Sequence, residues 1–144
     1  MEAPPKCFYK VNWDAAFSKS GGSIGFGIIV REHEGKFMAT KRVKREGFSD
    51  SLLAESIGAL HATLFVVELG MRKIVLEGDS LQALIKSIIL KFELWNSAGM
   101  IISNVKQHLC TFDSWFVNHI RRTTNGAAHM LAKSSLELVE DKAE

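Results

Sequence analysis

The stretch VNWDAAFSKSGGSIGFGIIV, residues Val11–Val30, decides the fold because it places an acid at the end of an apolar and aromatic run. That acid is Asp14, and a glycine-rich turn separates it from a second apolar run. Two such runs around a Gly-Gly pair are typical of antiparallel strands joined by a hairpin. Because a buried charge is costly without a partner, an acid at the end of a buried strand needs an explanation.

The composition of the 144-residue chain is that of one compact globular domain. Hydrophobic residues make up 47% of the chain and charged residues 24%, which is enough to bury a substantial core. We therefore expect a single domain over residues 1–144, with a core at about 6–138 and short frayed termini. The net charge of +2 does not by itself indicate a nucleic-acid-binding protein, so an anionic partner must be met by a local basic cluster.

The two cysteines, Cys7 and Cys110, are far apart and have no metal-ligand spacing. This argues against a zinc site and against a secreted, disulfide-stapled domain. The N-terminal residues lack the apolar core of a signal peptide, and no apolar run approaches the roughly 20 residues that span a bilayer. We expect an intracellular monomer that does not bind membranes; the sequence does not distinguish nucleus from cytoplasm.

Hydrophobic periodicity and turn residues predict the element order βββαβααβα. The predicted strands are Phe8–Asp14, Ser23–Arg31, Lys36–Lys44, Lys73–Asp79 and Phe112–Ile120. The predicted helices are Ser51–Leu69, Ser80–Leu90, Trp95–Leu109 and a last one from an N-cap at Thr124 to about Val139. Gly70 follows the first helix, where a left-handed C-terminal cap belongs. The order predicts an α/β fold with a five-stranded mixed sheet flanked by helices.

Three acids stand where this fold would bring them together. Asp14 and Asp79 each end a predicted strand, and parallel neighbouring strands would open both onto one crevice. Glu55 lies near the start of the first helix, where Ala59 and Ala62 continue its stripe and let it lie against the sheet. Converging carboxylates raise one another's pKa unless a divalent cation lies between them, and oxygen ligands suit Mg²⁺ or Mn²⁺. Metal binding is the favoured interpretation, with a helix N-cap as the alternative for Asp79.

Six blocks occur in a fixed order over roughly Lys10–Leu136. They are NWDAAF, GFGIIVREHEGK, AESIGALHATLFVVELG, IVLEGDS, Trp95 followed by an apolar helix, and FVNHIRRTTNGAAHMLAKSSL. With these blocks the chain resembles the ribonuclease H superfamily, in particular the reverse-transcriptase-like ribonuclease H domains of plant genomes and retrotransposons. The resemblance implies a ribonuclease H-like fold and a metal-dependent endonuclease that hydrolyses the RNA strand of RNA/DNA hybrids, with two Mg²⁺ or Mn²⁺ ions per site.

The resemblance also implies the catalytic and metal-binding residues. Asp14 would bridge both ions, while Glu55 and Asp79 would hold the ion on the leaving-group side. The closing family pattern N-x-x-A-D-x-L-A begins here at Asn125 and has His129 in place of the fourth acid, on the side of the ion that activates water. His129 is therefore either a metal ligand or an ordinary helical histidine. The substitution favours a second hypothesis, a catalytically weakened module that binds nucleic acid or a protein partner.

Basic side chains on and after the predicted strands are candidates for sequence-independent contacts with phosphates. These nucleic-acid-binding candidates are Lys41, Arg42, Arg121 and Arg122, together with Asn125. The alternating KRVKR run also fits a solvated strand edge. His119 is a candidate proton donor to the leaving group, although a histidine on a strand is often structural. The expected partner is an RNA/DNA hybrid, and the chain is either free-standing or part of a larger reverse transcriptase polyprotein.

Overall fold

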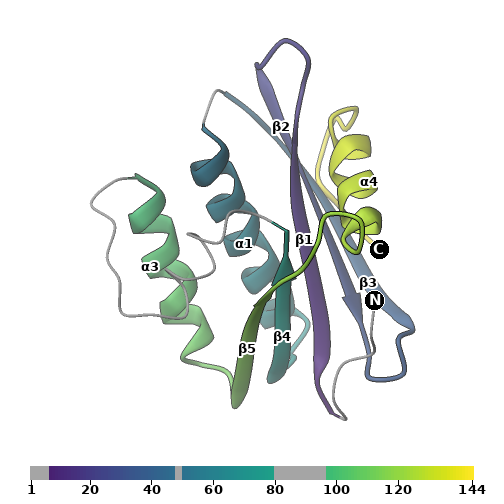
Figure 1. Ribbon diagram of the computed structural model, residues 1–144, viewed down its shortest axis with the longest axis vertical. Coiled ribbons are helices and arrows are strands. Elements are labelled where there is room, and N and C mark those ends of the chain that lie inside the picture. The colour runs from purple at the N-terminus through teal and green to yellow at the C-terminus, as the bar shows by residue number, and fades with distance from the viewer. Residues whose placement is uncertain (1–6, 48–49, 80–96) are drawn as a thin grey trace.

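The computed structural model describes residues 7–47, 50–79 and 97–144 and shows a mixed sheet with helices on both faces (Figure 1). The described strands are β1 (Tyr9–Phe17), β2 (Ser23–Arg31), β3 (Phe37–Glu46), β4 (Lys73–Gly78), β5 (Ser114–His119) and β6 (Lys142–Ala143). The described helices are α1 (Ser51–Glu68), α3 (Ser97–Leu109) and α4 (Gly126–Ser135). The α/β class is confirmed, with a sixth short strand added to the five predicted. The predicted helix at 80–90, and Trp95, lie outside the described residues.

The strand order β5-β4-β1-β2-β3-β6 makes the fourth strand a parallel neighbour of the first. β1, β2 and β3 form an antiparallel meander, whereas β4 runs parallel to both β1 and β5. The pairing of β1 with β4 ends at Trp13 and Gly78. The next residues, Asp14 and Asp79, are therefore delivered to the same edge of the sheet, as the sequence predicted.

The end of the first strand differs from the prediction. β1 continues beyond Asp14 to Phe17, and Asp14 itself stays paired with Gly27 of β2. The prediction that Asp14 ends its strand was wrong, because the strand loses only its neighbour β4 at this point. Asp14 is thus the first residue of β1 that pairs with β2 but no longer with β4.

Helix α1 packs against β1 and β2 of the sheet and against α3 (Figure 1). The Asp50 side chain caps it by accepting the N–H of Leu53 at 2.7 Å. Gly70 follows the helix at φ +76°, which confirms the predicted left-handed residue. The prediction that no apolar run approaches the length of a membrane span was wrong for this helix, which passes that test by length and composition. Its residues Ala59 and Ala62 are fully buried in the core of this domain.

Helix α4 lies against the opposite face of the sheet because two glycines of β2 leave room for it. A Cβ on Gly25 would lie 2.3 Å from the carbonyl oxygen of Ala132, and one on Gly27 would lie 2.4 Å from that of Ala128. Side chains at these two positions would push the helix away from the sheet. The close approach of α4 holds the histidine of its first turns near β1.

The last predicted helix is shorter than expected. Helix α4 has Asn125 rather than Thr124 at its N-cap and ends at Ser135 rather than near Val139. Turns follow the helix, and the chain then returns to the sheet. The apolar residues after Ser135 had extended the helical pattern, which is why the sequence placed the end too late.

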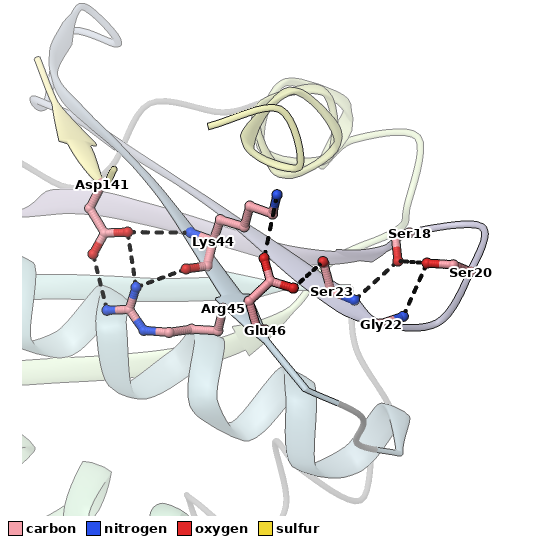
Figure 2. A network of polar contacts seen from close by, with 8 residues as sticks. All are labelled: Ser18, Ser20, Gly22, Ser23, Lys44, Arg45, Glu46 and Asp141. Atoms are coloured by element: carbon pink, nitrogen blue, oxygen red, sulfur yellow. Dashed lines mark hydrogen bonds and ion pairs between the residues drawn. The ribbon is translucent and has the colours of Figure 1, made fainter. Parts of the chain in front are cut away.

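The C-terminal residues clamp the edge of β3 (Figure 2). The Arg45 guanidinium donates two hydrogen bonds to the Asp141 carboxylate, at 2.9 and 3.0 Å. Glu46 accepts a hydrogen bond from the Ser23 hydroxyl at 2.8 Å and pairs with Lys44 at 3.5 Å. β6 then pairs with β3, so the prediction that this end of the chain is frayed was wrong. The acidic tail is ordered because it finds basic partners on β3.

Candidate metal centre

Three carboxylates from three parts of the chain converge at the edge of the sheet. Asp14 of β1, Glu55 of α1 and Asp79 after β4 offer oxygens that all lie within 4.8 Å of one another. The strands and the helix, rather than one flexible loop, set their separation. The structure thus brings together the three acids that the sequence singled out.

Burial and mutual repulsion shift the protonation of this cluster. Burial raises the pKa of Asp14, which is 1% exposed, and the Asp79 charge raises it further, while the hydrogen bond to His129 acts in the opposite direction. Burial raises the pKa of Glu55 to about 8, with added repulsion from Asp14 and Asp79. A cation would remove this repulsion, because it favours the ionised form of every carboxylate around it.

Two oxygens of the cluster are buried without a hydrogen-bond partner among the described residues. They are Oε2 of Glu55 and Oδ2 of Asp79. The guanidinium of Arg122 approaches Oδ2 of Asp79 to 3.8 Å, but its side chain is 75% exposed and forms no hydrogen bond there. Buried polar atoms are normally satisfied, so oxygens left without donors in an acidic cluster fit a divalent cation. A donor set made only of oxygens suits Mg²⁺ or Mn²⁺.

His129 reaches the centre through Asp14. Its Nδ1 lies 2.6 Å from Oδ2 of Asp14, and its side chain is 31% exposed, against 2% for the aspartate. His129 is not one of the residues whose ligand atoms all lie within 4.8 Å of one another. Its role as a metal ligand therefore stays a prediction. The hydrogen bond to Asp14 is a contact that the sequence did not suggest.

Trp13 holds the helix and both strands of the centre in place. Its indole N–H donates to the carbonyl oxygen of Glu55 at 3.2 Å. Gly58 and Gly78 make room for the indole, since a Cβ at these positions would lie 2.9 and 2.7 Å from ring atoms. This fully buried side chain links β1 to the helical turn of Glu55 and to β4 just before its acid. Sequence reasoning missed this role, although each glycine was visible near an acid.

The basic candidates do not form one cluster. Lys41 lies over an aromatic ring of α1, with its Nζ 5.6 Å from the ring centroid. Arg42 instead donates to the Ser134 hydroxyl of α4 at 3.2 Å, so adjacent residues of β3 face opposite sides of the sheet. Arg122 lies beside the metal centre, and Arg121 before it is exposed. Of these four candidates, Arg122 is the one that lies next to an acid of the centre, Asp79.

Asn125 and His119 complete the predicted site residues. Asn125 is 1% exposed, and its amide donates to the carbonyl oxygen of Trp13 at 2.9 Å. A buried side chain cannot contact a nucleic acid on the surface, so the prediction of such a contact for Asn125 was wrong. His119 ends β5, is exposed and pairs in register with Gly78. Gly78 directly precedes Asp79, so His119 lies near the acids. Its role as a proton donor stays a prediction.

Comparison with protein families identifies a match over most of the chain. The model of the family described as reverse transcriptase-like matches residues 12–135. A comparison with curated proteins finds no significant match.

Solved structures of three microbial ribonucleases H have a similar fold. Ribonuclease H1 of the halophilic archaeon Halobacterium salinarum NRC-1 has a TM-score of 0.82 at 23% identity, covering 90% of this chain and 98% of that chain. The N-terminal ribonuclease H domain of rv2228c from Mycobacterium tuberculosis has a TM-score of 0.79 at 15% identity, covering 90% and 94%. LC11-RNase H1, isolated from compost and determined in complex with an RNA/DNA hybrid, has a TM-score of 0.74 at 13% identity, covering 90% and 96%. At these identities the likeness shows the fold.

Proposed function

Because the chain belongs to the reverse transcriptase-like family of the ribonuclease H superfamily, we propose that it is a metal-dependent endonuclease that hydrolyses the RNA strand of RNA/DNA hybrids. Membership of the family supports a nucleic-acid-hydrolysing function in general. The observation that carries the finer proposal is the convergence of Asp14, Glu55 and Asp79, with two buried oxygens that have no hydrogen-bond donor among the described residues.

These three acids would hold the cations, and Asp14 would be the ligand shared between two of them. Divalent ions bound there supply a water of lowered pKa and neutralise charge on the scissile phosphate. The chain contributes a rigid arrangement of oxygens, since the acids come from β1, α1 and the end of β4. His129 engages Oδ2 of Asp14, so it would orient the carboxylate that holds the cations.

An RNA/DNA hybrid is the proposed substrate. The structurally similar LC11-RNase H1 was determined with such a hybrid bound, and this supports the same substrate class here. Arg122, exposed beside Asp79, is placed to contact a phosphate without reading its base. A domain that senses 2′-hydroxyls and groove shape should cut with weak sequence preference. The family also supports a working context beside a reverse transcriptase.

A nucleic-acid-binding module without efficient cleavage is the second candidate. The observation that favours it is His129, which replaces an acid of the family pattern and bonds to Asp14 instead of adding a negative charge. Fewer negative charges bind divalent cations more weakly. The fold and the exposed basic side chains would still bind nucleic acid.

Cleavage of a hybrid labelled on its RNA strand distinguishes the two candidates. The protein is incubated with EDTA, Mg²⁺ or Mn²⁺, and duplex DNA of the same sequence serves as the control substrate. An endonuclease shortens the labelled RNA only with a cation, whereas a binding module shifts the hybrid in a gel without shortening it. Equal cleavage of duplex DNA and hybrid would contradict the proposed specificity.

A further inference from the structure

Three polar side chains are buried near the candidate metal centre, and no step of the proposed function uses them. They are Asn12 on β1, Glu77 on β4 and Asn125 at the start of α4, exposed by 1%, 6% and 1%. The amide nitrogen of Asn12 donates to Oε1 of Glu77 at 3.4 Å and to Oδ1 of Asn125 at 3.3 Å. One amide thus joins the three elements. We call these residues the buried polar tier.

The buried polar tier lies next to the metal centre in the sequence. Each of its members comes two residues before an acid of the centre, or one helical turn before the histidine that contacts the centre. The pairs are Asn12 and Asp14, Glu77 and Asp79, and Asn125 and His129. Residues two apart on a strand, or four apart on a helix, share a face. Contacts within the tier therefore determine how the elements carrying the centre lie relative to one another.

Burial of these groups has a cost that their contacts must offset. A buried polar group destabilises the fold unless it is hydrogen-bonded, and a buried charge needs a partner. Glu77 has such a partner in Lys10, whose Nζ lies 3.5 Å from Oε1, and both side chains are nearly fully buried. Apolar side chains of similar size could fill this space without that cost. What the polar contacts add is direction, because hydrogen bonds require a particular geometry.

Asn125 contacts both sides of the centre. Its side-chain amide donates to the carbonyl of Trp13, the peptide group that leads into Asp14, at the point where β1 loses its pairing with β4. Its own carbonyl accepts the backbone N–H of His129 at 3.1 Å, in the first turn of α4. Although asparagine at an N-cap usually caps the helix with its side chain, Asn125 makes no such bond. The amide is directed to β1 instead.

From these contacts we propose that Asn125 is a positioning residue, which fixes α4 against β1 so that His129 stays bonded to Asp14. Asn12 supports it by holding its amide oxygen. The effect on cleavage rests on the proposed function, but the positioning itself depends on neither metal nor substrate. The experiment therefore measures the environment of the His129 ring directly, as well as the rate of hybrid cleavage.

The test compares Asn125→Ala and Asn125→Asp with the wild type and with Ser135→Ala. Ser135→Ala is the matched control, because it removes a fully buried hydroxyl from the far end of the same helix. Asn125→Asp keeps the size of the side chain and an acceptor for Asn12, but at neutral pH it presents no donor to Trp13. The first readout is the ¹⁵N spectrum of the histidine rings in metal-free protein, with the His129 signal assigned by its loss in His129→Ala.

We expect both Asn125 variants to move the His129 ring signal toward that of a solvated imidazole, while Ser135→Ala leaves it unchanged. The Kd for Mn²⁺, obtained from the rise of Tm with Mn²⁺ concentration, should increase by about 10- to 100-fold, the usual effect of removing a residue that orients a metal ligand. In the cleavage assay kcat should fall by a similar factor, with the KM for the hybrid nearly constant.

Several outcomes would overturn the proposal. A folded Asn125→Asp protein with the wild-type His129 signal and Mn²⁺ response would show that Asn125 only fills space. An equal change in Ser135→Ala would reduce the effect to general destabilisation. If Asn125→Ala does not fold, Asn125→Asp and Asn12→Ser carry the same test. If the wild type cuts no hybrid but the Asn125 variants still move the His129 signal, the proposed function is refuted and the positioning role is retained.

Discussion

Two regions of the sheet, the outer strand β3 and the metal centre beside β1 and β4, treat acidic side chains in opposite ways. At the edge of β3 the carboxylate of Asp141 is held by Arg45, and Glu46 is held by Ser23 and Lys44 (Figure 2). The hydrogen bond from Arg45 lowers the pKa of Asp141. At the metal centre three carboxylates converge, and Oε2 of Glu55 and Oδ2 of Asp79 have no hydrogen-bond donor among the described residues. Burial raises the pKa of both Asp14 and Glu55.

The difference separates acids that stabilise the fold from the acids to which we assign the proposed function. Where this chain uses an acid to hold segments together, it supplies a basic partner and a hydrogen bond. Buried carboxylates that repel one another destabilise a fold, and a cation bound between them would remove that cost. Substitutions in each of the two regions test this contrast.

The largest expected effect comes from Asp14→Asn. Because Asp14 would bridge both cations, its loss should abolish cleavage of the hybrid in Mg²⁺ and in Mn²⁺. The fold should remain intact, and the metal-free melting temperature should rise because a buried charge is removed. Gel assays of RNA cleavage and thermal melting measure the two effects. Asp141→Asn, the same substitution beside β3, is the control and should cut at the wild-type rate. An active Asp14→Asn protein would contradict the metal mechanism.

The next effect concerns the choice of metal. Mg²⁺ prefers oxygen ligands more strongly than Mn²⁺ does, so a histidine in place of an acid should make Mn²⁺ the better cofactor. His129→Asp adds a negative charge and should raise the activity in Mg²⁺, which narrows the preference. Cleavage rates of wild type, His129→Asp and His129→Ala in each metal provide the measurement. If all three proteins cut at the same rate and with the same metal preference, His129 has no role in the metal centre.

A smaller effect is a pH dependence of stability that arises from Glu55. Its pKa is raised from 4.5 to about 8, so the folded protein holds this proton more tightly than the unfolded chain does. Metal-free stability should therefore fall as the pH rises from about 4.5 to 8. Thermal melting in EDTA should show Glu55→Gln melting several degrees above wild type at pH 8, with little difference at pH 4.5. An equal gain at both pH values would assign the effect to packing.

The smallest effect is expected at the clamp of β3. The pKa of Asp141 is lowered, so its contribution is present above the unfolded value of 3.8 and is lost as the pH falls below it. Because both partners are partly exposed, Asp141→Asn should cost less than about 1 kcal/mol at pH 7. Urea unfolding at pH 7 and pH 2.5 tests this, and a cost that persists at pH 2.5 would show that the charge is not responsible.

The sequence predicted the parts of the fold that depend on local pattern. The spacing of apolar residues predicted α1, and strand order predicted that Asp14 and Asp79 meet, because parallel strands end at one edge. The sequence could not show that β1 continues past Asp14, since both faces of that strand are buried and the pattern does not change there.

Contacts between residues far apart in the chain could not be predicted from the sequence either. Asn125 was predicted to bind nucleic acid, because nothing in the residues near it shows that its amide reaches Trp13. The partnership of Arg45 with Asp141 joins residues 96 positions apart, so the tail was taken as frayed. The bond from His129 to Asp14 likewise follows from how closely α4 packs on the glycines of β2.

Calorimetric titration of the metal-free protein with Mn²⁺ at pH 7.5, in two buffers of different ionisation enthalpy, tests the cation site most directly. Binding should release protons, because Glu55 is largely protonated at this pH without a cation and must ionise to become a ligand. The measured heat should therefore differ between the buffers, and Asp14→Asn should abolish binding. Binding that is absent in the wild type, or that Asp14→Asn leaves unchanged, would contradict the assignment of these acids as a metal centre.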